Sequence, residues 1–478
     1  MKGGTRVDMF TLPPALIARL APGVPAAVAR APARLDVMGG IADYSGATVL
    51  QLPLVLGALV AAQRTNTGLL EASTAGPAAP SLAHPTSAIP GAVLRDGPAS
   101  DAPERLRAAL DRAGAPWAAY LLGPLAMLHA AGQLVLPAGE GLRLALWSEV
   151  PAGAGISSSA ALEVAALRAV AALYGLVLDP LALAVLAQQA EHRVAGAPCG
   201  LMDQATSALG RKDHLLVLRC QAASDHAAEV LGHRRLPRDA RVLGVDSRVT
   251  HRVAGAQYGR VRTAAFMGRA IIRAHDPAAL PRGYLCNLAP ARFADSYAPL
   301  LPVSMDGAHF AALYGATGDA ATHLDTSGAT PYAVRDCTAH PVYEAANVRV
   351  FLDALDSYER TGEREALARA GEAMAASHRS YGTRCGLGTP ETDLIVELVR
   401  AAGPTHGLYG ARITGGGAGG TVAVLGAGPD VDGAVRAVAR AYGEQTGNPA
   451  RVIAGSADGA LATPVQWVEA GGMGEVQG

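Results

Sequence analysis

One stretch limits what this chain can fold into: a loop of glycine, alanine and serine that runs directly into a helix-forming segment. Residues 151–161 read Pro-Ala-Gly-Ala-Gly-Ile-Ser-Ser-Ser-Ala-Ala, and residues 162–167 read Leu-Glu-Val-Ala-Ala-Leu. Glycines let backbone N–H groups turn inward at positive φ, and the first turn of a helix leaves further N–H groups unpaired. With the positive end of the helix dipole, these donors predict an anion site, most naturally for a phosphate chain. The alternative is an ordinary serine-capped helix after a glycine turn, which the length of the motif disfavours.

The basic residues restrict how a phosphate can be bound. Lysine occurs only at Lys2 and Lys212, so nearly all the positive charge is arginine. The chain has no Gly-x-x-x-x-Gly-Lys-Ser/Thr motif, and a phosphate site must therefore use backbone and arginine donors. A formal net charge of −1 gives no general electrostatic reason to expect nucleic acid or an anionic membrane as partner.

The composition indicates a soluble protein of the cytoplasm. Five cysteines, odd in number and in no Cys-x-x-Cys pattern, favour reduced thiols over disulfides or zinc. The N-terminus has no apolar core of signal-peptide length, and the most apolar long window, 117–136, is interrupted by Gly, Pro, His and Gln. This window therefore predicts a pair of buried helices rather than a membrane span.

A chain of 478 residues favours two domains. We expect a leader over 1–27, an N-terminal domain over 28–236, a C-terminal domain over 237–466 and a flexible tail over 467–478. Residues 68–101 and 287–335 carry few signals. Periodicity predicts helices at 103–134, 162–174, 181–194, 253–274, 340–360, 363–377, 390–402 and 429–445, and strands at 28–38, 142–149, 214–219, 241–246, 409–414 and 421–425.

Several separated motifs, taken in order, resemble the GHMP small-molecule kinases, and within them the galactokinase branch. They are Ala31-Pro32-x-Arg34 followed by Gly39-x-x-x-Asp43-Tyr44, the serine-rich loop, Gly196-x-Pro198-Cys199-Gly200-Leu201-Met202-Asp203-Gln204, Val245-x-Ser247 to Tyr258-x-x-Val261-Arg262, and the glycine cluster at 412–420. The resemblance covers most of 28–270 and 340–460. It implies an α+β fold of two domains with mixed and antiparallel sheets, and an active site in the cleft between them.

The resemblance implies ATP and Mg²⁺ as cofactors and assigns roles that the chemistry of the residues supports. Asp203 would accept the proton of a sugar hydroxyl, and the planar head of Arg34 would stabilise charge on the transferred phosphoryl group. Ser158 and Glu191 are the expected Mg²⁺ ligands, a hydroxyl and a hard carboxylate. The ATP phosphates would be bound by Pro151, Gly153, Ala154, Gly155, Ile156, Ser157, Ser158, Ser159, Ala160, Gly416 and Gly417.

The predicted sugar site departs from the galactokinase pattern. Its expected residues are Gly40, Asp43, Tyr44, Gly200 and Tyr258. Galactokinases carry Gly-Glu-His-Thr-Asp-Tyr where this chain has residues 39–44, so Gly40 and Ile41 replace the Glu and His expected near the C6 hydroxyl. L-Arabinopyranose is galactopyranose without that CH₂OH group, and an apolar site leaves no polar group unpaired when it binds the pentose.

We therefore expect L-arabinose, converted to L-arabinose 1-phosphate, as the substrate, and residues 34–46 also resemble the kinase domain of plant L-arabinokinases. Asp36 stands where galactokinases commonly carry asparagine, beside the Arg34 site.

Three alternatives stay open. The first is the same reaction on D-galactose. The second is a galactokinase-like regulator that senses sugar without catalysis, although Ser157–Ser159 and Asp203 are intact. The third is another GHMP activity on mevalonate or homoserine. We expect the monosaccharide and ATP as partners, with no nucleic acid and no membrane, and a monomer or weak homodimer.

Overall fold

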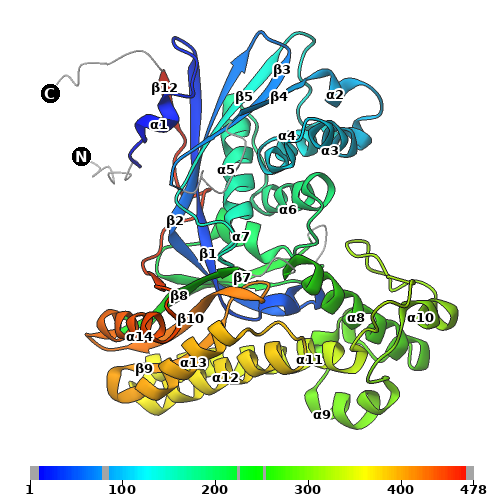
Figure 1. Cartoon of the computed structure of the whole chain (residues 1–478), viewed down its shortest axis with the longest axis vertical. Coiled ribbons are helices and arrows are strands. Elements are labelled where there is room, and N and C mark those ends of the chain that lie inside the picture. Colours follow the sequence, from blue (N-terminus) through cyan, green and yellow to red (C-terminus); the bar gives the residue numbers. More distant parts are fainter. Residues whose placement is uncertain (1–9, 78–85, 223–226, 251–253, 470–478) are drawn as a thin grey trace.

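The structure is a computed structural model that describes residues 10–77, 86–222, 227–250 and 254–469. Its strands form two sheets, each covered by helices (Figure 1). The larger sheet has the order β12-β1-β2-β5-β3-β4, with β6 beside β2 and β7 beside β6, and the smaller has the order β11-β8-β10-β9. The larger sheet contains β1 (Pro25–Met38), β2 (Thr48–Thr65), β3 (Leu69–Ala75), β4 (Thr86–Pro90), β5 (Gly141–Ser148), β6 (His214–Arg219), β7 (Glu229–Arg235) and β12 (Gln466–Glu469), and the smaller contains β8 (Ala240–Thr250), β9 (Leu408–Ile413), β10 (Gly419–Ala427) and β11 (Arg451–Ile453).

The long antiparallel pair β1–β2 connects the two halves of the molecule. Its register shifts between Pro32 and Arg34, and Arg34 then stands opposite Pro53. Because proline has no backbone N–H, neither proline can complete the ladder, and an irregularity at this point is expected. Beyond it, Leu35 and Val37 pack in a core that also contains residues of the smaller sheet and its helices. The strand thus carries Arg34 and Asp36 to the border between the sheets.

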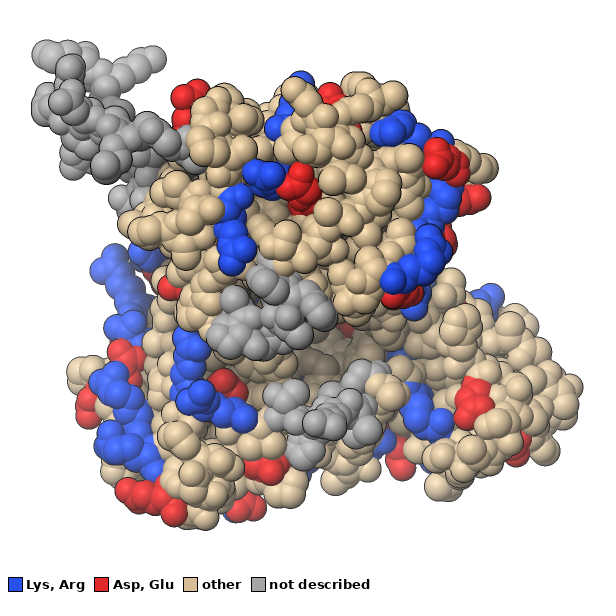
Figure 2. Space-filling view, turned by 45° about the horizontal axis from the view of Figure 1, so that its top comes forward, with Lys and Arg blue, Asp and Glu red and all other residues tan. Residues whose placement is uncertain are grey.

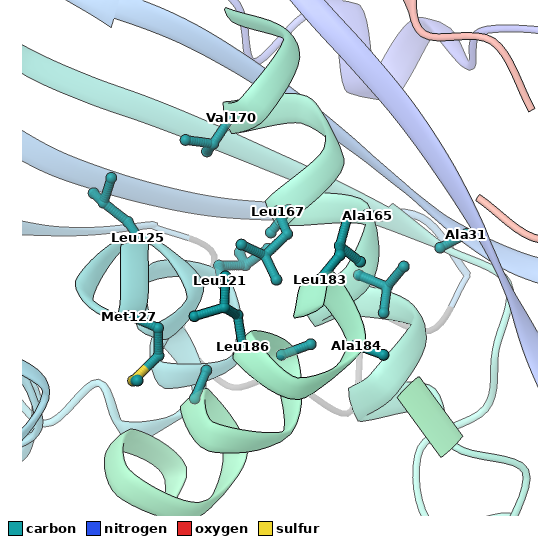
Figure 3. Packing of buried hydrophobic residues seen from close by; sticks show 14 of the residues in the cluster. Ala31, Leu121, Leu125, Met127, Ala165, Leu167, Val170, Leu183, Ala184 and Leu186 are labelled. Atoms are coloured by element: carbon teal, nitrogen blue, oxygen red, sulfur yellow. The ribbon is translucent and has the colours of Figure 1, made fainter. Parts of the chain in front are cut away.

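Helices pack on one face of the larger sheet. α5 (Ser158–Leu173) lies on β1 and β2, and α4 (Ala119–Ala130) and α6 (Pro180–Ala190) pack against α5. Figure 3 shows Leu121, Leu167 and Leu186 of these helices directed toward one another. Alanines between the leucines allow the helices to approach closely. The layer is completed by α3 (Ala102–Arg112) and α7 (Met202–Leu209), and a five-residue π-turn (Glu191–Ala195) follows α6.

The smaller sheet is covered by helices from the second half of the chain. α12 (Arg364–Thr383) approaches β9 so closely that a Cβ on Gly371 would lie 1.8 Å from the Tyr409 carbonyl oxygen. The other long helices are α8 (Ala254–His275), α11 (Val334–Thr361), α13 (Pro390–Ala402) and α14 (Val431–Thr446), and the short ones are α1 (Pro14–Ile17), α2 (Ala92–Arg95), α9 (Pro290–Arg292) and α10 (Gly307–Tyr314). Figure 2 shows a hollow between the two halves and side chains of both charge signs interspersed on this face.

The α+β fold with mixed and antiparallel sheets is confirmed, since β3 runs parallel to β5 and the other pairs described are antiparallel. The chain passes from the larger to the smaller sheet between Arg235 and Ala240, next to the predicted border at 236/237, and the domain limits themselves stay predictions.

The two predicted ends are wrong in detail. β1 begins at Pro25, inside the predicted leader, and Gln466–Glu469, mostly inside the predicted tail, pair with Pro25–Val28. Four residues are too few for a periodic pattern, so β12 had no detectable signal. Residues 1–9 and 470–478 lie outside the described part of the chain. None of the described helices has the length and apolarity that crossing a bilayer requires.

Candidate active site

The serine-rich loop forms the predicted turn into a helix. Gly153, Gly155 and Ser157 all have positive φ, at 75°, 73° and 60°. Ser157 is the N-cap of α5, but its side chain does not cap the helix. The N–H groups of the first turn of α5 are therefore not satisfied by a side-chain cap, and they lie where an anion gains both hydrogen bonds and the helix dipole.

Arg34, Asp203 and Ser157 form one hydrogen-bonded group at this helix end. Arg34 donates from Nε to Asp203 Oδ1 (2.8 Å) and from a terminal nitrogen to Asp203 Oδ2 (2.9 Å). Ser157 Oγ also donates to Asp203 Oδ2. The second terminal nitrogen of Arg34 donates to the Gly155 carbonyl at 2.8 Å, which ties the guanidinium to the loop. The bidentate pair fixes the orientation of the Asp203 carboxylate.

A second glycine loop, 415–420, meets the first one backbone to backbone. A Cβ on Gly415 would lie 2.7 Å from the Gly155 carbonyl oxygen, and one on Gly420 would lie 2.6 Å from that of Ala154. Thr421 Oγ1 donates to the Ala154 carbonyl at 2.7 Å. Glycine is required at both positions because any side chain would separate the loops.

A cavity of about 310 Å³ lies beside the Arg34–Asp203 pair and between the two halves of the molecule. It receives residues from β1, from α8 and from both glycine loops. Its lining consists of Arg34, Ile41, Asp43, Gly153, Gly155, Ala197, Pro198, Cys199, Gly200, Met202, Asp203, Tyr258, Gly416, Gly417, Ala418 and Gly419.

Asp43 lines this cavity and has one carboxylate oxygen without a hydrogen-bond partner. The residue lies in the short helical turn Gly40–Ser45 and is 4% exposed. Its Oδ1 accepts from the Tyr44 N–H (2.7 Å), whereas its buried Oδ2 has no protein partner. Burial, together with the nearby Asp203 charge, raises the pKa of Asp43 to about 8. Gly200 permits this packing, since a Cβ there would lie 1.4 Å from Asp43 Oδ2.

Two buried carboxylates lie behind Asp203. Gln204 Nε2 donates to Glu191 (2.7 Å) and to Glu163 (3.1 Å). Burial and the Asp203 charge raise the pKa of Glu191 to about 7, and burial and Glu191 raise that of Glu163 well above its usual range. Ser159 hydrogen-bonds with Glu191, and the assignment of Ser158 and Glu191 as Mg²⁺ ligands stays a prediction.

The donor set fits a divalent cation, because a positive charge would offset the repulsion between Asp203 and Glu191. Among the described residues no group of three or more His, Cys, Asp or Glu is arranged to hold a metal. A Mg²⁺ at Glu191 would therefore take most of its oxygens from phosphate and water.

Asp36 connects the helical turn Gly40–Ser45 with the second glycine loop. Its fully buried carboxylate accepts from the Gly40 N–H (3.2 Å) on one side and from the Gly415 N–H (3.3 Å) on the other. Gln51 Nε2 (2.6 Å) and the guanidinium of Arg412 (2.8 Å), which is also fully buried, complete its partners. Asp36 is thus paired with Arg412, and it has no ion pair with its neighbour Arg34.

Some of the predicted site residues line the cavity and others do not. Arg34, Asp203, Asp43, Gly153, Gly155, Gly200, Tyr258, Gly416 and Gly417 line it. Gly40 does not: a Cβ there would lie 1.8 Å from Tyr381 Oη, so the position faces a buried side chain. Tyr44 packs behind Tyr258 with ring centroids 6.1 Å apart. The others that do not line the cavity are Pro151, Ala154, Ile156, Ser157, Ser158, Ser159, Ala160 and Glu191.

Some residues of the site were not predicted as such. Cys199 and Met202 line the cavity, and both lie inside the quoted motif that ends in Asp203. Ile41, which replaces a polar residue of the galactokinase pattern, forms part of the cavity wall. Arg412 and Asp319, which hold the surroundings in place, carry no local sequence signal, because their partners are distant in the chain.

Models of known families match both halves of the chain. The GHMP kinases N terminal domain matches residues 120–211, and the GHMP kinases C terminal domain matches residues 361–445. Among solved structures, the galactokinase of Lactococcus lactis in complex with galactose has a TM-score of 0.68 at 21% identity and covers 93% of this chain and 95% of that one. The mevalonate kinase of Methanococcus jannaschii has a TM-score of 0.52 at 12% identity, with 90% and 98% covered. At these identities the two structures show that the fold is shared, and no more than that.

Curated relatives are more similar in sequence. The L-arabinokinase of Arabidopsis thaliana is 36% identical over 456 residues, which is 84% of this chain, and the chain spans 42% of that protein's length. The galactokinase of Chloroflexus aurantiacus is 30% identical over 423 residues, 88% of this chain and 90% of that one. With both family models matched in order and a relative covered almost from end to end, the chain belongs to the GHMP kinase family.

Proposed function

We propose that this protein transfers the γ-phosphoryl group of ATP to the anomeric hydroxyl of a monosaccharide, and that L-arabinose is its substrate. The observation that carries the proposal is the group Arg34–Asp203–Ser157 at the start of α5, beside a cavity that also contains the free acceptor of Asp43. A carboxylate, an arginine and an uncapped helix end are the parts that phosphoryl transfer to a hydroxyl requires.

Asp203 serves as the general base in this proposal. Its carboxylate, 17% exposed, faces the cavity and accepts the proton of the sugar hydroxyl as that oxygen attacks phosphorus. Arg34 orients Asp203 through two of its hydrogen bonds and retains N–H groups for the transferred phosphoryl group. The backbone of residues 153–160 and of Gly416 and Gly417 surrounds the phosphate chain.

ATP brings Mg²⁺ with it, and the metal would supply charge neutralisation between the phosphates. Glu191 is the proposed carboxylate ligand, and Ser158, the first residue of α5, the proposed hydroxyl ligand. Lysine is absent from this region, so the phosphates depend on backbone donors and on Arg34.

L-Arabinose is favoured over D-galactose by the wall at Ile41. This side chain is apolar and lines the cavity, and the neighbouring Gly40 position is closed by Tyr381. The C6 hydroxyl of a hexose would lack the polar partners that Gly40 and Ile41 replace, and a buried hydroxyl without a hydrogen-bond partner costs roughly 1–3 kcal/mol. The similarity to L-arabinokinase at 36% identity supports the same choice.

D-Galactose is the second candidate, because the galactokinase of Chloroflexus aurantiacus is similar over 90% of its length. An assay of ADP release with L-arabinose, D-galactose and D-galacturonate at equal concentrations separates the candidates. We expect the largest kcat/KM with L-arabinose. A galactose value equal to or above it would reject the substrate assignment and leave the sugar kinase.

The assay also tests the sensor alternative, in which ATP and sugar bind and no ADP is released. Asp203→Ala is the matched negative control. We also propose that the protein is cytoplasmic, which fractionation would test, and that it is a monomer or weak homodimer, which light scattering would test. Limited proteolysis would test the domains at 28–236 and 237–466.

A further inference from the structure

Arg262 lies behind the sugar cavity, where α8 meets the segment between α10 and α11. Its guanidinium forms a bidentate pair with Asp319, with both N–O distances at 2.8 Å. The two side chains are 10% and 5% exposed. Asp319 lies in the region 287–335, for which the sequence offers no role.

The same guanidinium reaches two residues that line the cavity. Its remaining terminal nitrogen lies 3.3 Å from the Cys199 carbonyl oxygen and 3.5 Å from that of Pro198. Its positive charge also acts on the nearby Tyr258 hydroxyl, where it opposes the rise in pKa that burial causes. Because Arg262 belongs to α8 and the carbonyls belong to the loop before α7, these contacts cross from one half of the molecule to the other.

The loop that Arg262 holds is the one whose position matters most to Asp43. Gly200 follows Cys199 directly and lies against Asp43 Oδ2 without space for a Cβ, and Asp203 stands three residues further on. The loop has other supports, since Ala197 N–H donates to the Glu191 carbonyl (3.0 Å) and His192 Nε2 donates to the Cys199 carbonyl (2.7 Å). Those supports come from the loop's own half of the molecule, whereas Arg262 contacts the loop from the other half.

Asp319 fixes the orientation of the Arg262 guanidinium. Burial raises the pKa of Asp43, and the positive charge of Arg262 opposes that rise, so the two groups are electrostatically close. Asp319 engages one edge of the guanidinium, and the remaining terminal nitrogen faces the Cys199 and Pro198 carbonyls. Arg262 therefore does not pair with Asp43, whose Oδ2 has no protein partner.

We infer that Arg262 and Asp319 act as one positioning pair that holds the 197–200 loop and Tyr258 in the geometry the sugar needs. The inference rests on the proposed sugar phosphorylation and assigns a role to part of the region 287–335. Neither residue contacts the phosphate loop, so the pair acts on sugar binding and leaves ATP binding unchanged.

The test compares Arg262→Gln, Asp319→Asn, their double variant and Arg262→Lys in the full chain, with the sugar that the wild type phosphorylates fastest. Glu71→Gln, which breaks the partly buried Arg143–Glu71 pair away from the site, is the control. We expect each single variant to raise KM for the sugar about 10-fold or more, with KM for ATP within about twofold, because each loses hydrogen bonds to a charged group. The double variant should raise KM for the sugar no more than the single variant with the larger effect. Arg262→Lys should have a lower KM for the sugar than Arg262→Gln.

The outcomes are separable. A sugar KM within about twofold of wild type in Arg262→Gln overturns the inference, and additive losses in the double variant overturn the pairing. Equal rises in both KM values, or a matching effect of Glu71→Gln, would mean a general structural role and would also overturn it. If the wild type phosphorylates no monosaccharide, the proposed function fails before any variant is made, and this inference fails with it. Thermal melting and ATP binding confirm folding, and the isosteric Asp319→Asn serves where Arg262→Gln does not fold.

Discussion

At the scale of single residues, the chemistry depends on how side chains around one carboxylate divide their hydrogen bonds. Asp203 accepts from Arg34 and from Ser157, so its oxygens are oriented before substrate arrives. Ser157 stays available for this contact because it leaves the helix uncapped, at a φ of 60°. The side-chain cap of α5 is thus replaced by a hydrogen bond that orients the Asp203 carboxylate.

Asp203→Asn should reduce kcat by about 10²–10⁴-fold, because the amide keeps the size of the side chain and cannot accept the sugar proton. Stopped-flow or coupled ADP release gives the rate, and KM for ATP should change little. Asp179→Asn is the matched control, since Asn also caps a helix and Asp179 caps α6 far from the cavity. A kcat equal to wild type in Asp203→Asn would remove this residue from the mechanism.

Asp43 predicts a pH dependence of sugar binding. Its pKa of about 8 in the unliganded protein means that the carboxyl group is largely protonated at neutral pH. Sugar hydroxyls that donate to the carboxylate favour its ionised form, so binding should release a proton and the affinity should rise between about pH 6.5 and about pH 8.5. Calorimetry in buffers of different ionisation enthalpy measures the release, and its absence at about pH 7 would contradict the assignment.

The same group has the opposite effect on stability. A pKa raised by folding contributes stability that is complete below the unfolded value and is lost as pH rises through about 8. Unliganded wild type should therefore lose Tm relative to Asp43→Asn as the pH rises from about 5 to about 8, with a constant difference above that range. A Tm difference between the two proteins that does not change from about pH 5 to about pH 8 would exclude the raised pKa of Asp43.

At the scale of elements, the site depends on glycines that let loops touch. Gly415 and Gly420 admit the carbonyls of the first loop, and Gly200 admits Asp43. These contacts are between backbone and neighbour, so a methyl group is enough to disturb them.

Gly200→Ala should raise KM for the sugar about 10-fold or more, because its Cβ would lie 1.4 Å from Asp43 Oδ2 and must displace either Asp43 or the loop. KM for ATP should stay near wild type. Gly259→Ala in α8 is the control: nothing lies within 4 Å of its Cβ, and alanine in a helix stabilises by about 0.5–1 kcal/mol. Steady-state kinetics on both variants decides, and a normal sugar KM in Gly200→Ala would show that the loop yields freely.

At the scale of the whole molecule, the two halves meet through buried polar contacts as well as apolar ones. Asp36, on the long strand β1, accepts from the Gly40 N–H, from the Gly415 N–H and from Arg412 of β9. The turn at 40–45 and the second glycine loop are thereby attached to one carboxylate. Its negative charge pairs with the buried charge of Arg412.

Asp36→Asn should lower the free energy of unfolding by about 3–5 kcal/mol, since Arg412 would keep a buried charge without its ionic partner. Chemical denaturation monitored by tryptophan fluorescence measures the loss. Glu104→Gln breaks the exposed pair with Arg193 and should cost less than about 1 kcal/mol. A difference between wild type and Asp36→Asn no larger than that of the control would contradict the role of the buried pair.

Some predicted site residues line the cavity and others do not, for physical reasons. Asp203, Arg34 and Gly200 lie in short motifs whose residue types are dictated by the chemistry, and all three line the cavity. Gly40 and Tyr44 lie in an equally clear motif and turn away from the cavity, because the 3₁₀ turn at 40–45 directs consecutive side chains to different sides. The residue types therefore predicted the loop, and the geometry of the turn determines which of its residues line the cavity.

The glycine- and serine-rich loop, the helix that follows it and the family could be predicted from the sequence, because they depend on neighbours within a few residues and on motif order. Three contacts follow only from the folded molecule: the pairing of Asp36 with Arg412 and not with Arg34, the place of β12 beside β1, and the pairing of Asp319 with Arg262. Each of these contacts joins residues far apart in the chain, and the burial that makes them selective exists only after the two sheets have packed together.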